Sequence, residues 1–144
     1  MSDLHETGRR GPRNDPAPIL GAAQMTLLWI AKLVAAGLLG YHGVLKLIEN
    51  PADVALFEMI GMEPAGRYVI GVLELLSAAL VLIPQSALFG AFLGFGIMMG
   101  AIIGHLSSFG LHGIWWAILV AAACVTILYV RRHDAKFIRH LWDR

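Results

Sequence analysis

Ionisable residues inside or at the rim of long apolar stretches are the first candidates for chemistry in this sequence. A charge at the centre of a bilayer costs about 2.5–3.5 kcal/mol on insertion scales, so such residues are functional candidates by default. Their types permit hydrogen bonding to a ligand, ion pairing between helices, or proton exchange at a carboxylate. The candidates are His42, Lys46, Arg67, Glu74 and His105, with Lys32 as a secondary member nearer the other side of the membrane.

Helical spacing predicts that these side chains face one another. Lys32, His42 and Lys46 fall within about 80° of one another at 100° per residue, which puts them on one face of a helix. Arg67 and Glu74 share a face of the next apolar segment but lie two turns apart, too far for a tight pair within that helix. Glu74 therefore needs a partner from another span, and Lys46 or His42 is the natural one.

Helical rise puts the five candidates together in the outer half of the membrane, and it leaves their role open. His42 and Glu74 lie at one depth, about 9–10 Å below the outer face, and the other three lie closer to it. One interpretation is a set of interhelical pairs that fix a small bundle, with Lys46 and Arg67 reaching to the interface. The other is a ligand-binding or proton-exchange site. A haem held by His42 and His105 is disfavoured because two histidines without a helical pair motif are a weak signal.

Composition identifies the elements that must carry these residues. Of the 144 residues, 58% are hydrophobic and 15% are charged, against roughly 45–50% and about 25% in an ordinary soluble domain. The apolar residues come in blocks of about twenty, the length that crosses a bilayer as a helix. We therefore predict an all-α integral membrane protein, a four-helix transmembrane bundle with spans at 25–48, 67–83, 87–106 and 114–130. The single cysteine, Cys124, excludes dithiol chemistry within the chain.

The chain divides into three predicted parts. Residues 1–23 mix charge, proline and glycine without apolar periodicity and should form a disordered cytoplasmic tail. Residues 24–130 form the four-span domain, and residues 131–144 form a basic amphipathic cytoplasmic tail that contacts membrane lipids. Basic residues gather in both tails and are absent from the first and third loops, so the positive-inside rule places both termini in the cytoplasm, with the chain in the inner (cytoplasmic) membrane. Nothing indicates nucleic-acid binding.

Two further elements are predicted around the spans. Asn50 and Pro51 are the N-cap and N1 signals of a short helix over 51–60, which Gly61 should end. This helix is either an interfacial connector or a lid over a pocket, with Leu56, Met59 and Ile60 on the outer face of the bundle. The tryptophans at the ends of the spans, Trp29, Trp115 and Trp116, are typical interfacial anchors.

The third span carries small residues at GxxxG spacing, which lets helix backbones approach closely in a membrane. We assign both series to packing within the bundle, with a homo-oligomer contact as the alternative. They are Gly90 with Gly94, and Gly96 with Gly100 and Gly104.

These motifs together resemble the DoxX family of small four-span membrane proteins over about residues 25–110. The first span is similar in its basic residue and G-x-x-K-L ending, the second in its Gly-x-x-Glu, and the third in a small-residue run that ends in histidine. The matching residues are Lys32, Gly43, Lys46, Leu47, Gly71, Glu74 and His105.

The resemblance implies a function in a redox or oxidative-stress system. The founding member is associated with a thiosulfate:quinone oxidoreductase, and more distant four-span relatives act as assembly chaperones or cargo receptors. We therefore expect an accessory subunit without catalytic activity of its own, partnered by subunits of a membrane redox complex. A quinone-like or small hydrophobic ligand is expected in the outer polar pocket, where Lys46, His42 or His105 would hydrogen-bond a carbonyl. The alternatives are a membrane assembly factor with a structural charge cluster and a small proton-coupled carrier.

Overall fold

The computed structural model describes residues 21–108 and 113–132, and every regular element in these ranges is a helix. The predicted all-α fold is confirmed, and the four spans correspond to the long helices with their ends shifted by a few residues. Most of the two predicted tails, residues 1–20 and 133–144, lies outside the described residues. In chain order the helices are α1 (Ala22–Leu47), α2 (Pro51–Met59), α3 (Ala65–Leu82), α4 (Ala87–Ser108) and α5 (Trp115–Val130).

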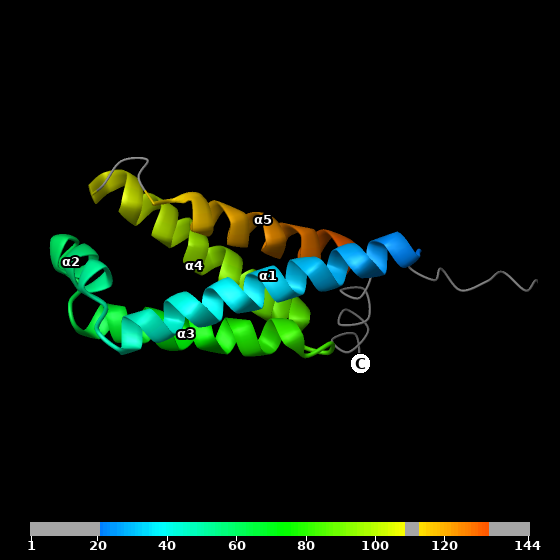
Figure 1. The fold of residues 1–144 in the computed structure, drawn as a ribbon, viewed down its shortest axis with the longest axis horizontal. Coiled ribbons are helices and arrows are strands. Elements are labelled where there is room, and N and C mark those ends of the chain that lie inside the picture. The colour runs from blue at the N-terminus through cyan, green and yellow to red at the C-terminus, as the bar shows by residue number, and fades with distance from the viewer. Residues whose placement is uncertain (1–20, 109–112, 133–144) are drawn as a thin grey trace, which may run out of the picture.

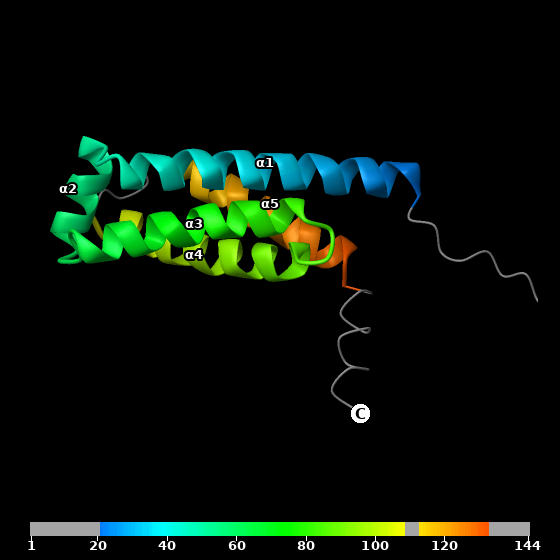
Figure 2. The same ribbon diagram turned by 90° about the horizontal axis from the view of Figure 1, so that it is seen from below.

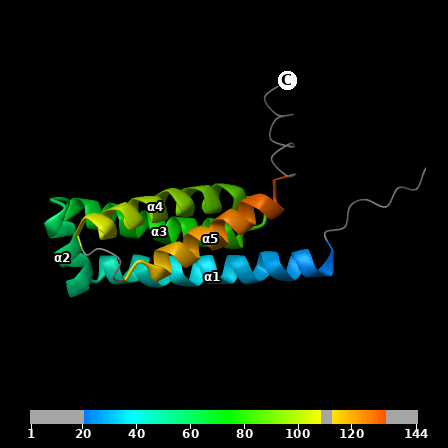
Figure 3. The ribbon, with the colours of Figure 1, turned by 90° about the horizontal axis from the view of Figure 1, so that it is seen from above.

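The four long helices form a ring in which α1 contacts α3, α3 contacts α4, α4 contacts α5, and α5 closes back onto α1. Helix α5 runs obliquely between α1 and α4 (Figure 3). Helix α2 lies across one end of the bundle, hereafter the α2 end (Figures 1 and 2). The C-termini of α1 and α4 and the N-termini of α3 and α5 meet at this end.

The helices have the lengths and surfaces of a membrane bundle. Helices α1, α3 and α4 are long and apolar enough to cross a membrane, and α5 is a shorter apolar helix. Large hydrophobic side chains such as Leu33, Phe92 and Ile103 are exposed on the outside, as expected where lipid is the solvent. The core is built largely of small and aliphatic residues, among them Ala35 and Leu39.

Helices α1 and α3 cross at a pair of glycines. A Cβ atom placed on Gly43 would lie 2.9 Å from the carbonyl oxygen of Gly71, and one placed on Gly71 would lie 3.1 Å from that of Gly43. Side chains at either position would push the helices apart. Both glycines belong to the motifs that carry the family resemblance, so those motifs encode a close helix contact.

The two glycine series of α4 have different surroundings. Gly90 packs against the backbone of α3, where a Cβ atom would lie 2.6 Å from the amide nitrogen of Val81. Ser77 Oγ donates a hydrogen bond of 2.8 Å to the Gly90 carbonyl across this interface. Gly94 is similarly enclosed, so the predicted intramolecular packing holds for this series.

The predicted packing within the bundle was wrong for the second glycine series of α4. Within the part of the chain that the structure describes, a Cβ atom on Gly96, Gly100 or Gly104 would meet nothing within 4 Å. Gly96 follows Gly94 by two residues, which turns it by about 200° to a different side of α4.

Helix α2 begins as the sequence predicts. The Asn50 side chain accepts a hydrogen bond of 3.0 Å from the Ala52 amide, Pro51 is the first helical residue, and Gly61 follows the helix at a φ of 70° that favours glycine. The predicted orientation of its apolar side was wrong in part. Leu56 is buried with Phe57 against the bundle, whereas Met59 and Ile60 are exposed.

The contrast between the glycine series predicts a difference in stability. We expect Gly90→Ala to lower the free energy of unfolding by about 1–3 kcal/mol, because its methyl group meets rigid α3 backbone. Gly96→Ala is the matched control in the same helix and should leave stability unchanged or slightly higher. Denaturant unfolding of the purified chain in detergent measures both. Equal effects of the two substitutions would contradict the close α3–α4 contact.

Candidate functional site

The centre of the candidate site is a buried ion pair between α1 and α3. Lys46 Nζ lies 3.1 Å from Glu74 Oε2, and the two residues are 4% and 0% exposed. Each lies one helical turn beyond a glycine of the α1–α3 crossing, Gly43 or Gly71, so the close approach there brings the two side chains together. The prediction that Glu74 takes its partner from the first span is confirmed, and that partner is Lys46.

A second carboxylate joins this pair from α2. Asp53 Oδ1 lies 3.5 Å from Lys46 Nζ, so one ammonium group forms ion pairs with carboxylates from two helices. Asp53 was not among the candidates predicted from the sequence. A usable signal was present, because a buried lysine faced by an acidic loop without Lys or Arg has a natural partner in that loop.

Arg67 anchors the α2 end of the bundle and lies apart from the Lys46–Glu74 pair. Its Nη2 atom lies 2.8 Å from Glu63 Oε1 and 3.5 Å from Glu49 Oε1, and its Nη1 atom donates to the carbonyl of Lys46. The residue is only 1% exposed. Arg67 therefore ties the end of α1 to the start of α3, and its guanidinium is enclosed by protein.

Glu49 and Tyr68 extend this anchor at the surface. Tyr68 donates a hydrogen bond of 2.5 Å to Glu49 Oε1, and its ring lies 4.4 Å from the guanidinium carbon of Arg67. The Tyr68 hydrogen bond, with the nearby Arg67 charge, lowers the pKa of Glu49 below its usual value. Glu49 therefore stays an anion and an acceptor at neutral pH.

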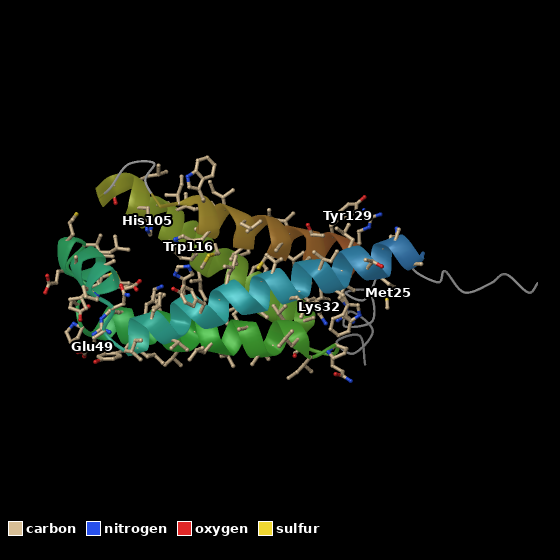
Figure 4. The ribbon with its side chains drawn as sticks, in the orientation of Figure 1. Met25, Lys32, Glu49, His105, Trp116 and Tyr129 are labelled. Carbon is tan, nitrogen blue, oxygen red and sulfur yellow. The ribbon has the colours of Figure 1, made fainter. Side chains whose placement is uncertain are left out.

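Trp116 contacts both histidines of the predicted cluster, and Figure 4 labels its side chain near His105. Its ring stacks on His42 at a centroid distance of 3.8 Å and meets His105 edge to face at 6.0 Å. Lys46 Nζ lies 5.5 Å from the Trp116 ring, within cation–π range. The prediction of a simple interfacial anchor suits Trp115, which is 76% exposed, but it missed the inward contacts of Trp116.

The hydrogen bond of His105 fixes the role of one ring nitrogen. Nδ1 lies 2.9 Å from the carbonyl oxygen of Ala101, one turn earlier in α4. A carbonyl oxygen only accepts, so Nδ1 carries the hydrogen and is the donor of this bond. Among the described residues, no group of three or more His, Cys, Asp or Glu side chains is arranged to hold a metal ion.

Lys32, the secondary candidate, lies apart from the cluster in the half of the bundle away from the α2 end (Figure 4). It is 2% exposed, and its Nζ atom donates a hydrogen bond of 3.3 Å to the carbonyl of Leu82 at the end of α3. The same ammonium lies 4.9 Å from the Trp29 ring. Lys32 thus caps the C-terminus of α3, where a cation is favoured.

A cavity of about 230 Å³ opens beside the ion pair, hereafter the α2–α4 cavity. Glu74 and Lys46 line it together with Asp53, His105 and Trp116, and most of its remaining wall is apolar. Gly96, Gly100 and Gly104 lie along its α4 side, and Leu56 and Phe57 come from α2. The glycines that do not pack within the bundle therefore leave space for this cavity.

A second, larger cavity of about 470 Å³ is lined by residues of α1, α2, α4 and the start of α5. His42 lines this cavity with Asn50 and Gly113, and it does not line the α2–α4 cavity. Asp53, Leu56, His105 and Trp116 line both. The structure thus separates His42 from Glu74 and leaves Lys46, Glu74 and His105 as the sequence candidates on the α2–α4 cavity.

Comparison of the sequence with known proteins identifies one family. A family model described as DoxX-like matches residues 30–130 of the chain. The chain belongs to the DoxX-like family. The family resemblance seen in the sequence is confirmed, and this DoxX-like chain is a multi-pass membrane protein. No curated protein and no solved structure matches it.

The buried pair makes a clear prediction for stability. We expect Lys46→Met to lower the free energy of unfolding by about 3–5 kcal/mol, because it leaves the buried Glu74 carboxylate without its cation. The double variant Lys46→Met/Glu74→Leu should recover most of that loss, since both charges are gone. Denaturant unfolding in detergent measures all variants.

Lys32→Met is the matched control, since it makes the same change in the same helix. Its loss should be smaller, because the partner left behind is a carbonyl and not a carboxylate. Additive losses in the Lys46/Glu74 double variant, or equal losses for Lys32→Met and Lys46→Met, would contradict the pair.

Proposed function

We propose that this DoxX-like chain is an accessory membrane subunit of a redox or oxidative-stress system that binds a quinone-like or other small hydrophobic ligand. The observation that carries the proposal is the α2–α4 cavity, an apolar space of about 230 Å³ with the Lys46–Glu74 pair in its wall. Ligand sites are typically apolar hollows with a few placed polar groups. Family membership supports the redox setting, and the proposed role needs ligand binding but no catalysis by this chain.

The walls of the cavity suit a flat apolar ligand. Gly96, Gly100 and Gly104 expose the backbone of α4 along one side, which lets a ring lie close to the helix. Phe57 and Trp116 contribute aromatic surface to the lining. A planar ring with a short chain therefore finds apolar contact on several sides and polar groups at one edge.

The second candidate function is a membrane assembly factor. The observation that favours it is the Arg67 anchor, in which buried charge is fully engaged in holding α1 and α3 together. If the Lys46–Glu74 pair has the same purpose, the charge cluster is structural and the function lies in binding a client protein.

We further propose that the α2 end faces away from the cytoplasm in the inner membrane. The loop between α1 and α3 carries Glu49, Asp53, Glu58 and Glu63 and no Lys or Arg, whereas Arg131 and Arg132 lie at the opposite end of the bundle. The positive-inside rule then puts both termini in the cytoplasm. Membrane lipids, and in this proposal the subunits of a redox complex or a second copy of the chain, are its partners.

Filling the cavity should remove the ligand without unfolding the protein. We expect native mass spectrometry of the gently solubilised chain to show a bound small molecule, and Gly100→Leu to lose it, because the new side chain enters the α2–α4 cavity. Gly37→Leu is the matched control, since Gly37 also has open space around its Cβ position but lines neither cavity. It should keep the bound molecule.

The same spectra separate the two candidate functions. A bound small molecule that Gly100→Leu removes supports the ligand-binding subunit. A chain that carries no small molecule and instead retains a stoichiometric protein client, in wild type and Gly100→Leu alike, would replace it with the assembly factor.

Cysteine labelling tests the orientation. Cys124 is the only cysteine and is buried, so Cys124→Ala gives a background for single new thiols. We expect a membrane-impermeant maleimide to label Glu58→Cys on α2 in intact spheroplasts and to label Ser2→Cys only after the membrane is opened. The reverse pattern would show that the termini face outward.

A further inference from the structure

The carboxylate of Glu74 is a buried acceptor that lacks a hydrogen-bond donor. The residue is 0% exposed and lines the α2–α4 cavity, and neither of its oxygens accepts a hydrogen bond from the described residues. Lys46 Nζ makes an ion pair with Oε2 at 3.1 Å. The other oxygen, Oε1, has neither a cation nor a donor among them. Because buried polar groups are nearly always satisfied, this atom points to a missing partner.

The other polar groups on the cavity wall are mainly acceptors or already engaged. Asp53 is an acceptor, and Nδ1 of His105 already donates to the Ala101 carbonyl. Lys46 is shared between two carboxylates, so its ammonium is a poor donor for a ligand carbonyl. Trp116 also lines the cavity and carries an indole N–H donor. The cavity wall is therefore poor in the donors that the sequence led us to expect for a ligand carbonyl, since His42 lies on the second cavity.

We infer that the ligand of the α2–α4 cavity is an apolar, ring-bearing molecule with a hydroxyl group that donates its hydrogen to Glu74 Oε1. This inference rests on the proposed function and specifies its ligand. A hydroxyl donates and accepts, so it satisfies the carboxylate while lying near Lys46 and Trp116. A quinone carbonyl only accepts and leaves Oε1 unsatisfied, so of a quinone pair the reduced, hydroxyl-bearing form is the one retained.

A neutral donor fits this place better than an ammonium group. Lys46 Nζ already lies on the other oxygen of the same carboxylate, and an ammonium ligand would have to leave water for a largely apolar cavity, which costs far more than burying a hydroxyl group. The cation–π position over Trp116 is likewise occupied by Lys46. The inference therefore commits to phenols and related hydroxyl compounds.

A pair of ligands that differ in one hydrogen-bond donor tests the inference. Calorimetric titration of the full chain in nanodiscs uses 4-n-propylphenol and 4-n-propylanisole, with empty nanodiscs subtracted for partitioning. We expect the phenol to bind at least about tenfold more tightly, as a hydrogen bond to a charged group provides. Gly100→Leu should abolish both signals if they come from this cavity.

Glu74→Gln tests the acceptor directly. The preference for the phenol should fall below about threefold in this variant, because a neutral amide is a weaker acceptor than a carboxylate. Glu58→Gln makes the same change on an exposed residue outside the cavity and should keep the full preference. If Glu74→Gln does not fold, the phenol and anisole comparison in the wild-type chain still decides.

The outcomes separate this inference from the proposed function. Equal binding of phenol and anisole, both blocked by Gly100→Leu, would leave the ligand site standing and overturn the hydroxyl assignment. A phenol preference that persists in Glu74→Gln, or tighter binding of 3-phenylpropylamine than of the phenol, would also overturn it. Binding of none of the three compounds would count against the proposed ligand site itself.

Discussion

The buried ion pair between Lys46 and Glu74 is the constraint around which this bundle is organised. Taking two charges out of water costs several kcal/mol per ion, and only close, well-ordered geometry compensates for that cost. The Gly43–Gly71 crossing provides it, since each glycine lies one helical turn before a charged partner and lets the two backbones approach. The glycines and the charges therefore form one unit, and a side chain at either glycine would separate the charges as well as the helices.

The charged residues at the α2 end divide into two groups with different surroundings. Arg67 is enclosed by Glu49, Glu63 and a backbone carbonyl, and its donors are used to join α1 to α3. Glu74 lines a cavity and has an oxygen that no described residue serves. Helix α2 belongs to the second group, because its Asp53 pairs with Lys46 and its apolar side lines the cavity. The short helix α2 thus contributes both a charged side chain and part of the cavity wall to the same site.

Periodicity and helical rise were sufficient to predict the spans and to narrow the partner of Glu74 to Lys46 or His42, and the cap signals at Asn50 and Pro51 predicted the short helix. They fail where the answer depends on how α2 folds back and how each helix is rotated. Asp53 reaches Lys46 only because α2 lies across the bundle end. Trp116 differs from Trp115 only in the direction its side chain takes around the α5 axis. The pattern GxxxG indicates a face of small residues, but it does not say whether a helix or a space lies opposite.

The open space beside Gly96, Gly100 and Gly104 affects which molecules can fill the α2–α4 cavity. In a membrane, an unfilled apolar groove between helices is ordinarily occupied by lipid tails, which supply the same contacts as leucine side chains. Gly96, Gly100 and Gly104 alone would thus be satisfied by any acyl chain. Glu74 changes the balance, because an acyl chain brings no donor and leaves a buried carboxylate oxygen unsatisfied. The preference of this site for a ligand over lipid therefore depends on one polar group, the Glu74 carboxylate. A ligand that combines a ring with a hydrogen-bond donor binds better there than the surrounding lipid.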